Sequence, residues 1–289
     1  MRPPGNDGVT LRATVKRSLA DVGLLEPGRQ LRDKLRAITW LPHNRRYLSR
    51  AGSDGLPIPP ARLRLLTTAS PSIEWFMESG RAGADAIRNL LAEHDLLLSR
   101  QARLLDFGCG CGRVLRHWAR DGINVDGCDY NPELIGWCRD RLPFATVDTN
   151  QLEPPLPYDQ ARFDLVYALS VFTHLPEPLQ RPWAEELARV TVPGGHLIVS
   201  THGAAYRGAL TLDERAHYDA GHLVVKNAAE PGSNRCGVYA SPDAVRQTFS
   251  PWFMVRAHVP QGASGNPPQD LVLLRRTPTE AAAPTERPA

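Results

Sequence analysis

A glycine-rich turn between a strand and a helix constrains this chain more than any other feature. The run Leu104–Arg113 reads LLDFGCGCGR, and the apolar residues around its start predict a strand, Ala102–Phe107. We expect a helix from Gly112 to Arg120 directly after the turn. Glycine lets a backbone approach a ligand closely and adopt angles that other residues resist. The turn therefore predicts a ligand site at the carboxyl end of the first strand.

Strand-like and helix-like patterns alternate around this turn, which implies right-handed crossovers and a mostly parallel sheet. We predict an α/β fold: a doubly wound, mostly parallel seven-stranded sheet with an antiparallel edge hairpin and a helical N-terminal extension. The further expected strands are Ile123–Cys128, Ala145–Val147, Phe163–Leu169, His196–Thr201, Phe253–Val259 and Asp270–Arg275. The expected helices start near Ala82, at Pro132 behind Asn131 as N-cap, at Pro178 and at Ser241, and the third ends at a Pro193–Gly195 turn.

The chain divides into three zones by composition. Residues 1–71 are rich in Arg, Pro and Gly and predict short helices in Leu19–Leu25 and Leu31–Trp40, broken at Pro27 and Pro42, with a linker at Gly52–Pro60. Residues 72–276 form the sheet domain, interrupted by an irregular insert, 204–239. Residues 277–289 are Pro, Thr, Glu and Ala and are expected to be a disordered tail. The insert and the first zone are candidates for a lid.

Composition argues against several classes of protein. The formal net charge is only +3, which does not suggest a nucleic-acid partner. The five cysteines fit neither a disulfide framework nor zinc spacing, so we expect core residues and no metal. The start of the chain lacks a signal pattern and no long apolar run occurs, so we expect a cytoplasmic protein with no membrane partner.

The spacing of the turn distinguishes between cofactors. The G-x-G-x-x-G fingerprint of dinucleotide-binding proteins, started at Gly108, would need a glycine where Arg113 stands, so it does not fit. The G-K-[ST] of the Walker phosphate-binding loop is absent from the sequence. The pattern is D-x-G-x-G-x-G, and the carboxylate of Asp106 would repel a pyrophosphate but suit a cationic amino group. This motif resembles the first motif of the class I S-adenosylmethionine-dependent methyltransferases of the small-molecule type.

The resemblance covers residues 82–275 and implies S-adenosyl-L-methionine as cofactor. It implies that Asp129, at the end of the second strand, binds the ribose hydroxyls, and Tyr130 could pack on adenine. Asp148 and Asn150 both follow the third strand where the family contacts the adenine amino group, and Asn150 is preferred. The expected cofactor-binding residues are Asp106, Gly108, Cys109, Gly110, Gly112, Arg113, Asp129, Tyr130, Asn150, Leu169 and Ser170.

Two histidines are the candidate catalytic bases. His174 follows the fourth strand and His202 ends the fifth, and an imidazole titrates in the useful range. A base is needed only if the acceptor is a protonated nucleophile. The alternative for His174 is a histidine that packs against or caps the next helix. Weaker candidates in or near the acceptor pocket are His217, His222, Tyr206 and Tyr218, and the Trp75–Phe76 pair either edges the cofactor or packs in the core.

The acceptor itself is not identified by sequence. The string Ala168–Val171 differs from the Asp/Asn-Pro-Pro-Tyr pattern of enzymes that methylate bases or glutamine amides, which favours O- or N-methylation of a metabolite or sugar. A protein or RNA methyltransferase remains an alternative, for which Arg45, Arg46, Arg50, Arg62 and Arg64 are the only hint. Two further alternatives are a non-catalytic module that binds the cofactor and a nicotinamide-dependent oxidoreductase, which Arg113 disfavours.

Overall fold

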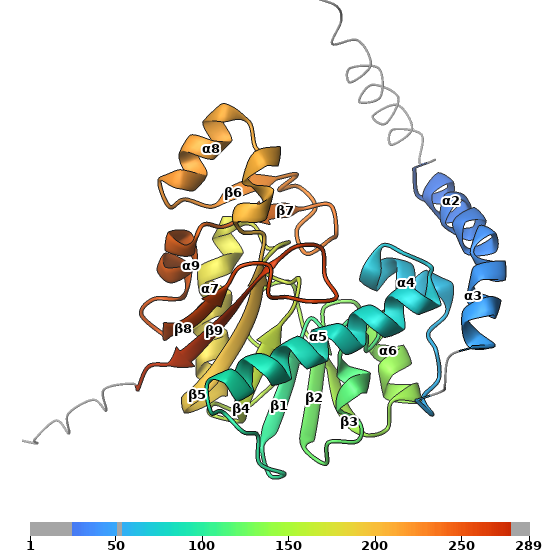
Figure 1. Ribbon diagram of the computed structural model, residues 1–289, viewed down its shortest axis with the longest axis horizontal. Coiled ribbons are helices and arrows are strands. Elements are labelled where there is room, and N and C mark those ends of the chain that lie inside the picture. The colour runs from blue at the N-terminus through green and yellow to red at the C-terminus, as the bar shows by residue number, and fades with distance from the viewer. Residues whose placement is uncertain (1–24, 51–53, 279–289) are drawn as a thin grey trace, which may run out of the picture.

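One seven-stranded sheet organises the molecule (Figure 1). The computed structural model describes residues 25–50 and 54–278. Five strands run parallel, β9 is antiparallel to β5 and to β8, and the order is β3-β2-β1-β4-β5-β9-β8. In that order the strands are Ala145–Thr149, Asn124–Asp129, Arg103–Phe107, Phe163–Ala168, Thr191–Thr201, Asp270–Arg276 and Phe253–Val259. The predicted fold class and edge hairpin are confirmed.

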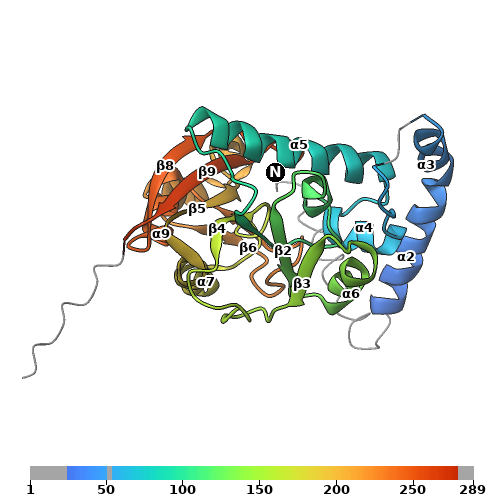
Figure 2. The ribbon, with the colours of Figure 1, turned by 90° about the horizontal axis from the view of Figure 1, so that it is seen from below.

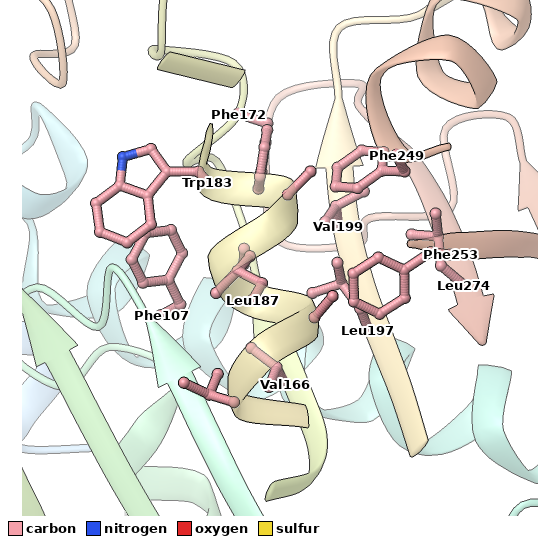
Figure 3. Close-up of a cluster of buried hydrophobic side chains, with 14 of the residues drawn as sticks. Phe107, Val166, Phe172, Trp183, Leu187, Leu197, Val199, Phe249, Phe253 and Leu274 are labelled. Atoms are coloured by element: carbon pink, nitrogen blue, oxygen red, sulfur yellow. The ribbon is translucent and has the colours of Figure 1, made fainter. Parts of the chain in front are cut away.

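Helices cover both faces of the sheet (Figure 2). On one face α5 (Ile73–Glu93) and α6 (Pro132–Arg141) pack with residues such as Ile87 and Ile135 against the sheet. On the other face α7 (Glu177–Val190) and α9 (Pro242–Phe249) pack with Trp183 and Phe249 (Figure 3). A sheet buried on both faces needs nearly continuous apolar strands, and the run around Val166 supplies one.

Two helix predictions are wrong in position or type. Helix α5 begins nine residues before Ala82, because Ser72 accepts a hydrogen bond from the Trp75 N–H and caps a helix there. After the glycine turn only a short 3-10 helix forms, η1 (Leu115–Trp118). Gly112 has a φ of +81°, outside the right-handed helical region, so an α-helix cannot start at that residue.

The described part of the N-terminal zone, residues 25–50 and 54–71, contains three helices. Helices α2 (Leu25–Thr39) and α3 (Leu41–Leu48) are present. The predicted break at Pro42 is confirmed, because α2 ends at Thr39 and Pro42 lies in the first turn of the next helix, where a missing N–H costs no bond. The predicted break at Pro27 is wrong, because Pro27 lies in the first turn of α2. Residues 19–24, the start of one predicted helix, lie outside the described part of the chain, as does most of the predicted tail. Helix α4 (Ala61–Thr68) follows.

The segment before α4 is not a free linker over the residues that the structure describes. Asp54 pairs with the buried guanidinium of Arg116 at 2.7 Å, and Arg116 also donates to the carbonyl oxygens of Leu56 and Pro57. A buried arginine must be paired, so this contact ties residues 54–57 to the sheet domain.

The insert contains regular structure instead of being irregular. It forms η2 (Ala204–Ala209), α8 (Leu212–Asp219) and a two-stranded ribbon of β6 (Val224–Lys226) and β7 (Gly237–Tyr239). The expected Pro193–Gly195 turn is wrong as well, because β5 starts at Thr191 and passes through these residues beside a register shift in its pairing with β4. The division of the chain into extension, sheet domain and insert stays a prediction.

The structure also bears on the cysteines, on metal binding and on membrane-spanning helices. All five cysteines are buried and free, as core residues are. In the residues that the structure describes, no cluster of three or more His, Cys, Asp or Glu side chains could hold a metal ion. No described helix is both long and apolar enough to cross a bilayer.

Candidate active site

A cavity of about 900 Å³ lies at the carboxyl ends of β1, β2 and β4. The strand order reverses between β1 and β4, and open α/β sheets bind ligands at such a switch point. The predicted residues that line the cavity are Asp106, Gly108, Cys109, Gly110, Arg113, Asp129, Tyr130, Asn150, Leu169, Ser170, His174 and His202. Of the residues predicted for the cofactor and for catalysis, Gly112 alone does not line it.

The glycine turn follows β1 in a backbone conformation that side chains resist. Gly108 and Gly110 have φ values of +80° and +57°. A Cβ on Gly110 would lie 2.6 Å from Cγ2 of Thr67, and one on Gly108 would lie 2.4 Å from Cγ2 of Val171. Any larger residue would therefore be strained and would also collide with the opposite wall.

Gly112 serves the packing beneath the turn. A Cβ there would lie 2.4 Å from Cδ1 of Leu142, which is fully buried. The prediction that it contacts the cofactor therefore has no support from its position. Its part is to let the turn lie close to the end of α6.

Asp129 braces the turn and faces the cavity. One carboxylate oxygen accepts the N–H of Gly110 at 3.0 Å and the other accepts the N–H of Asn131 at 2.9 Å. Burial raises the pKa of this carboxyl above its usual value, and the two donors oppose that rise. A carboxylate offers about four acceptor positions, so two remain for hydroxyl donors of a ligand.

Asn150 is the better placed of the two residues considered after the third strand. It is buried in the cavity wall, whereas Asp148 does not line the cavity. Its amide nitrogen donates to the carbonyl oxygen of Gln151 at 2.6 Å, and its Oδ1 has no hydrogen-bond partner. A buried acceptor without a partner is costly unless a ligand supplies the donor.

Asp106 presents a second unpartnered oxygen. Burial raises the pKa of this carboxyl to about 7, although Tyr167 and Arg113 nearby act in the opposite direction. Its Oδ2 has no hydrogen-bond partner. Arg113 is itself buried and donates to Ser79 and Asn266, which ties the turn to α5 and to the loop between β8 and β9.

The two candidate bases lie side by side in the cavity wall. The ring centroids of His174 and His202 are 6.2 Å apart. Nδ1 of His174 lies 2.6 Å from the carbonyl oxygen of Cys236, and Nδ1 of His202 lies 3.1 Å from that of Val238. A carbonyl only accepts, so each Nδ1 carries the proton and each Nε2 is an acceptor, which in His202 lies 3.5 Å from the amide nitrogen of Gln269.

Both rings are neutral at pH 7. Burial lowers the pKa of His174 below its usual value, and burial aided by the neighbouring His174 lowers the pKa of His202 to about 4. The alternative that His174 caps the next helix is wrong, because the N-cap of α7 is Pro176 and makes no side-chain cap. The pair can therefore accept a proton from an acceptor that carries one.

The weaker candidates for the acceptor pocket lie in different parts of the molecule, and most of them do not line the cavity. Tyr206 does not line the cavity but its ring packs on His202 with centroids 4.5 Å apart. Tyr218 is wrong as a pocket residue, because it is buried among Leu210 and Val224 within the insert. His217 and His222 stack on each other away from the cavity. Trp75 lines the cavity, whereas Phe76 is a core residue.

Two residues of the cavity wall were not predicted: Gln269 in the loop between β8 and β9, and Tyr239 at the end of β7. The Oε1 of Gln269 accepts from the hydroxyls of Ser170 and Ser200, at 3.0 and 2.7 Å, and its amide nitrogen lies 3.5 Å from Nε2 of His202. Tyr239 also lines the cavity, with its ring centroid 5.2 Å from that of His202. No local sequence signal marks either residue.

The insert and α4 close over the cavity from opposite sides. The hydroxyl of Tyr130 donates to the carbonyl oxygen of Gly232 at 3.3 Å, and the N–H of Gly232 donates to the carbonyl oxygen of His174 at 2.9 Å. Asn234 donates to the carbonyl oxygen of Leu66 in α4 at 3.2 Å. These bonds join elements that are far apart in the sequence around one ligand volume.

Comparisons with known proteins agree with this geometry. Residues 105–199 match the methyltransferase domain family. A ubiquinone biosynthesis O-methyltransferase of Cronobacter sakazakii is 30% identical over 103 residues, 34% of this chain and 42% of that protein. A probable tRNA methyltransferase 9B of Homo sapiens is 34% identical over 97 residues, 33% of this chain and 20% of that protein. The chain thus spans less than half the length of either relative.

A solved structure supports the fold. The S-adenosylmethionine-dependent methyltransferase of Methanosarcina mazei superposes with a TM-score of 0.51 at 18% identity, covering 65% of this chain and 98% of that one. The matched stretch contains the glycine turn and most of the five parallel strands, and residues from it line one side of the cavity. Residues 105–199 thus match the methyltransferase domain family, and the fold is similar to that of an S-adenosylmethionine-dependent methyltransferase.

Proposed function

We propose that the protein transfers a methyl group from S-adenosylmethionine to a small molecule held beside His174 and His202. One observation carries the proposal: two buried oxygens in the cavity wall, Oδ2 of Asp106 and Oδ1 of Asn150, have no protein partner. Both can accept, and the cofactor offers an ammonium and an adenine amino group as donors. The residues present therefore fit the cofactor.

The cofactor supplies a methyl group that is already activated on a sulfonium. The protein's part is to bind and to align. Asp106 would hold the ammonium, Asp129 the ribose hydroxyls and Asn150 the adenine amino group, while the turn at Gly108 and Gly110 leaves room for close approach.

The acceptor would lie on the side of the cavity formed by His174, His202 and Tyr239. A neutral Nε2 can take the proton of a hydroxyl or of another protonated nucleophile as the new bond forms. Tyr239 adds an aromatic wall. This lining favours O- or N-methylation of a metabolite or sugar, and the relative named for ubiquinone biosynthesis, an O-methyltransferase, supports a small acceptor.

A methyltransferase acting on RNA is the second candidate, because one relative is named as a probable tRNA methyltransferase. The cavity argues for the small molecule, since the insert and α4 meet across it through Asn234 and Leu66 and narrow the approach. Transfer of labelled methyl groups to total tRNA at moderate salt would favour RNA instead, while transfer to a metabolite extract would favour the proposal.

Cofactor binding is tested by calorimetry with S-adenosylmethionine and its demethylated product. We expect Asp129→Ala to weaken binding by roughly 1–3 kcal/mol, the scale for losing hydrogen bonds to a charged group. Asp148→Ala, which changes a carboxylate outside the cavity, is the matched control and should bind normally. Equal affinity of the Asp129 variant and the wild type would refute the ribose role, and tight binding without turnover on any acceptor would indicate a non-catalytic module.

A further inference from the structure

Helix α2 carries an apolar stripe that the protein does not cover. Leu31, Leu35 and Ile38 are spaced at i, i+4 and i+7 and fall within one narrow arc of the helix. Their exposed fractions are 60%, 55% and 60%. Lys34 and Arg32 border this stripe on its two sides at helical spacing, and both are exposed.

Helix α3 extends the same outer surface. Its inner side is fixed to the domain: Asn44 is buried and binds the backbone of Pro71 and Ile73, and Tyr47 donates to Glu78 of α5 at 3.0 Å. Leu41 and Leu48, seven residues apart, border this inner side and are each about half exposed. We call Leu31, Leu35, Ile38, Leu41 and Leu48 the outer stripe.

Positive charge is concentrated around the outer stripe. Residues 25–50 contain seven Lys or Arg and two Asp or Glu, whereas the rest of the chain has 27 and 29. Within the described residues, Lys34, Arg45 and Arg46 make no ion pair, although Arg32 pairs with the adjacent Asp33. The segment is therefore a basic patch on a chain whose remainder is slightly acidic.

We propose that the outer stripe and its flanking basic residues dock the protein on an anionic membrane surface. A basic helix with an apolar face on its outer side is the pattern that lies in the plane of a bilayer interface, where apolar side chains enter the acyl boundary and basic ones meet lipid phosphates. The proposal is independent of the methyl transfer proposed above, and it differs from the expectation from composition that no membrane is a partner.

Other occupants fit the patch less well. RNA would use the basic residues but would leave five large apolar side chains in water. A second copy of the chain placed by two-fold symmetry would set two such basic patches against each other, which costs electrostatic energy. Of these three occupants, the anionic bilayer satisfies both the charge and the apolar surface.

The location of the patch gives the docking a consequence. Helices α2 and α3 form an outer edge of the molecule in both views (Figures 1 and 2). Arg32 and Arg36 of α2 also line the cavity. Docking through the outer stripe would therefore leave the side of α2 that lines the cavity turned away from the bilayer surface.

The test is flotation of the full chain with vesicles of phosphatidylcholine containing 30% phosphatidylglycerol. We expect the wild type to float with these vesicles and not with pure phosphatidylcholine. A triple serine variant should bind the vesicles at least about tenfold more weakly, because it loses the apolar side chains that enter the acyl boundary. This variant combines Leu31→Ser, Leu35→Ser and Ile38→Ser. A triple glutamine variant should bind the vesicles about fivefold more weakly for each charge removed. This variant combines Lys34→Gln, Arg45→Gln and Arg46→Gln.

Matched controls keep the result interpretable. Leu97→Ser and Leu212→Ser remove apolar side chains that are even more exposed, from other parts of the molecule, and these variants should float like the wild type. Circular dichroism and calorimetry with S-adenosylmethionine check that the variants stay folded. The proposal is overturned if the wild type fails to float or if the triple serine variant floats normally. It is also overturned if the wild type does not float but binds tRNA or self-associates, and the triple serine variant loses that activity.

Discussion

The two halves of the cavity are built in different ways. The half proposed for the cofactor uses residues from a short stretch, Asp106 to Asn150, each next to the end of a parallel strand. The half proposed for the acceptor joins His174, Tyr239 and Gln269, which lie on three separate connections. The first half follows from the sheet, because the ends of parallel strands meet at one edge. The second half exists only when the insert and the β8–β9 hairpin are in place.

The largest expected effect lies in the acceptor half. We expect His174→Gln or His202→Gln to lower turnover by about 10²–10⁴-fold if that residue is the base, because glutamine cannot take up the proton. Affinity for S-adenosylmethionine should stay within about twofold, because neither ring lies among the residues proposed to hold the cofactor. Single-turnover kinetics with calorimetry on the same preparations separates the two quantities. Full turnover in both variants would mean that the reaction needs no base from this pair.

The next effect lies in the cofactor half. Gly110→Val should weaken cofactor binding by at least ~2 kcal/mol, since valine disfavours a positive φ and its side chain would meet Thr67. Gly136→Val is the control, because a Cβ at that position meets nothing within 4 Å. Thermal denaturation of both variants shows whether the fold survives. A Gly110→Val protein that binds the cofactor normally would contradict the close approach at this turn.

The two halves should also respond differently to pH. The pKa of Asp106 is about 7, so its carboxylate is lost as pH falls through 7, and affinity for the cationic cofactor should drop by roughly tenfold from pH 8 to pH 6. The pKa of His202 is about 4, so this ring stays an acceptor throughout that range. Calorimetry across the range, repeated with Asp106→Asn, measures the difference. A slope that persists in the Asp106→Asn variant would assign the pH dependence to another group.

The stability of the folded protein should fall with acid through His202. Its folded pKa of about 4 lies below the usual 6.5, so the unfolded chain binds the proton first as pH falls below 6.5. Because protonation favours the unfolded chain, the free energy of unfolding should fall progressively as the pH falls from 6.5 to 4. Urea denaturation at pH 7 and pH 5 should show a smaller loss for His202→Gln than for the wild type.

The smallest expected effect is at the adenine end. Asn150→Ala should weaken cofactor binding by roughly 0.5–1.5 kcal/mol, the net value of one neutral hydrogen bond. Calorimetry with adenosine and with S-adenosylmethionine should show the same loss, because both contain the adenine amino group. A loss confined to the larger ligand would place Asn150 at another part of the cofactor.

Much of the cofactor half could be predicted because its signals are local. The glycine spacing, the acid at Asp129 and the strand patterns each lie within a few residues of the feature they indicate, and the structure brings them to one cavity. Gly112 is the exception, since its neighbour Leu142 is 30 positions away. Position in the motif did not distinguish a glycine that faces a ligand from one that faces the core.

Local signals failed where distant contacts determine the structure. Tyr218, predicted for the pocket, instead packs inside the insert. The start of α5 is a different case, because the Ser72 cap is a local signal that the prediction overlooked. The Pro193–Gly195 run reads as a turn, yet pairing with β4 and β9 holds its surroundings in a strand. Propensity is a weak preference that packing and ladder hydrogen bonds override.

The amino-acid sequence by itself determined the sheet and the cofactor edge, because apolar periodicity and a glycine turn act over a few residues. Only the tertiary structure decided which way His174 and His202 hold their protons, since their Nδ1 partners are carbonyl oxygens 62 and 36 residues away. It also decided that the stripe of α2 faces outward. A helical pattern shows that one face is apolar, but what covers that face depends on the rest of the fold.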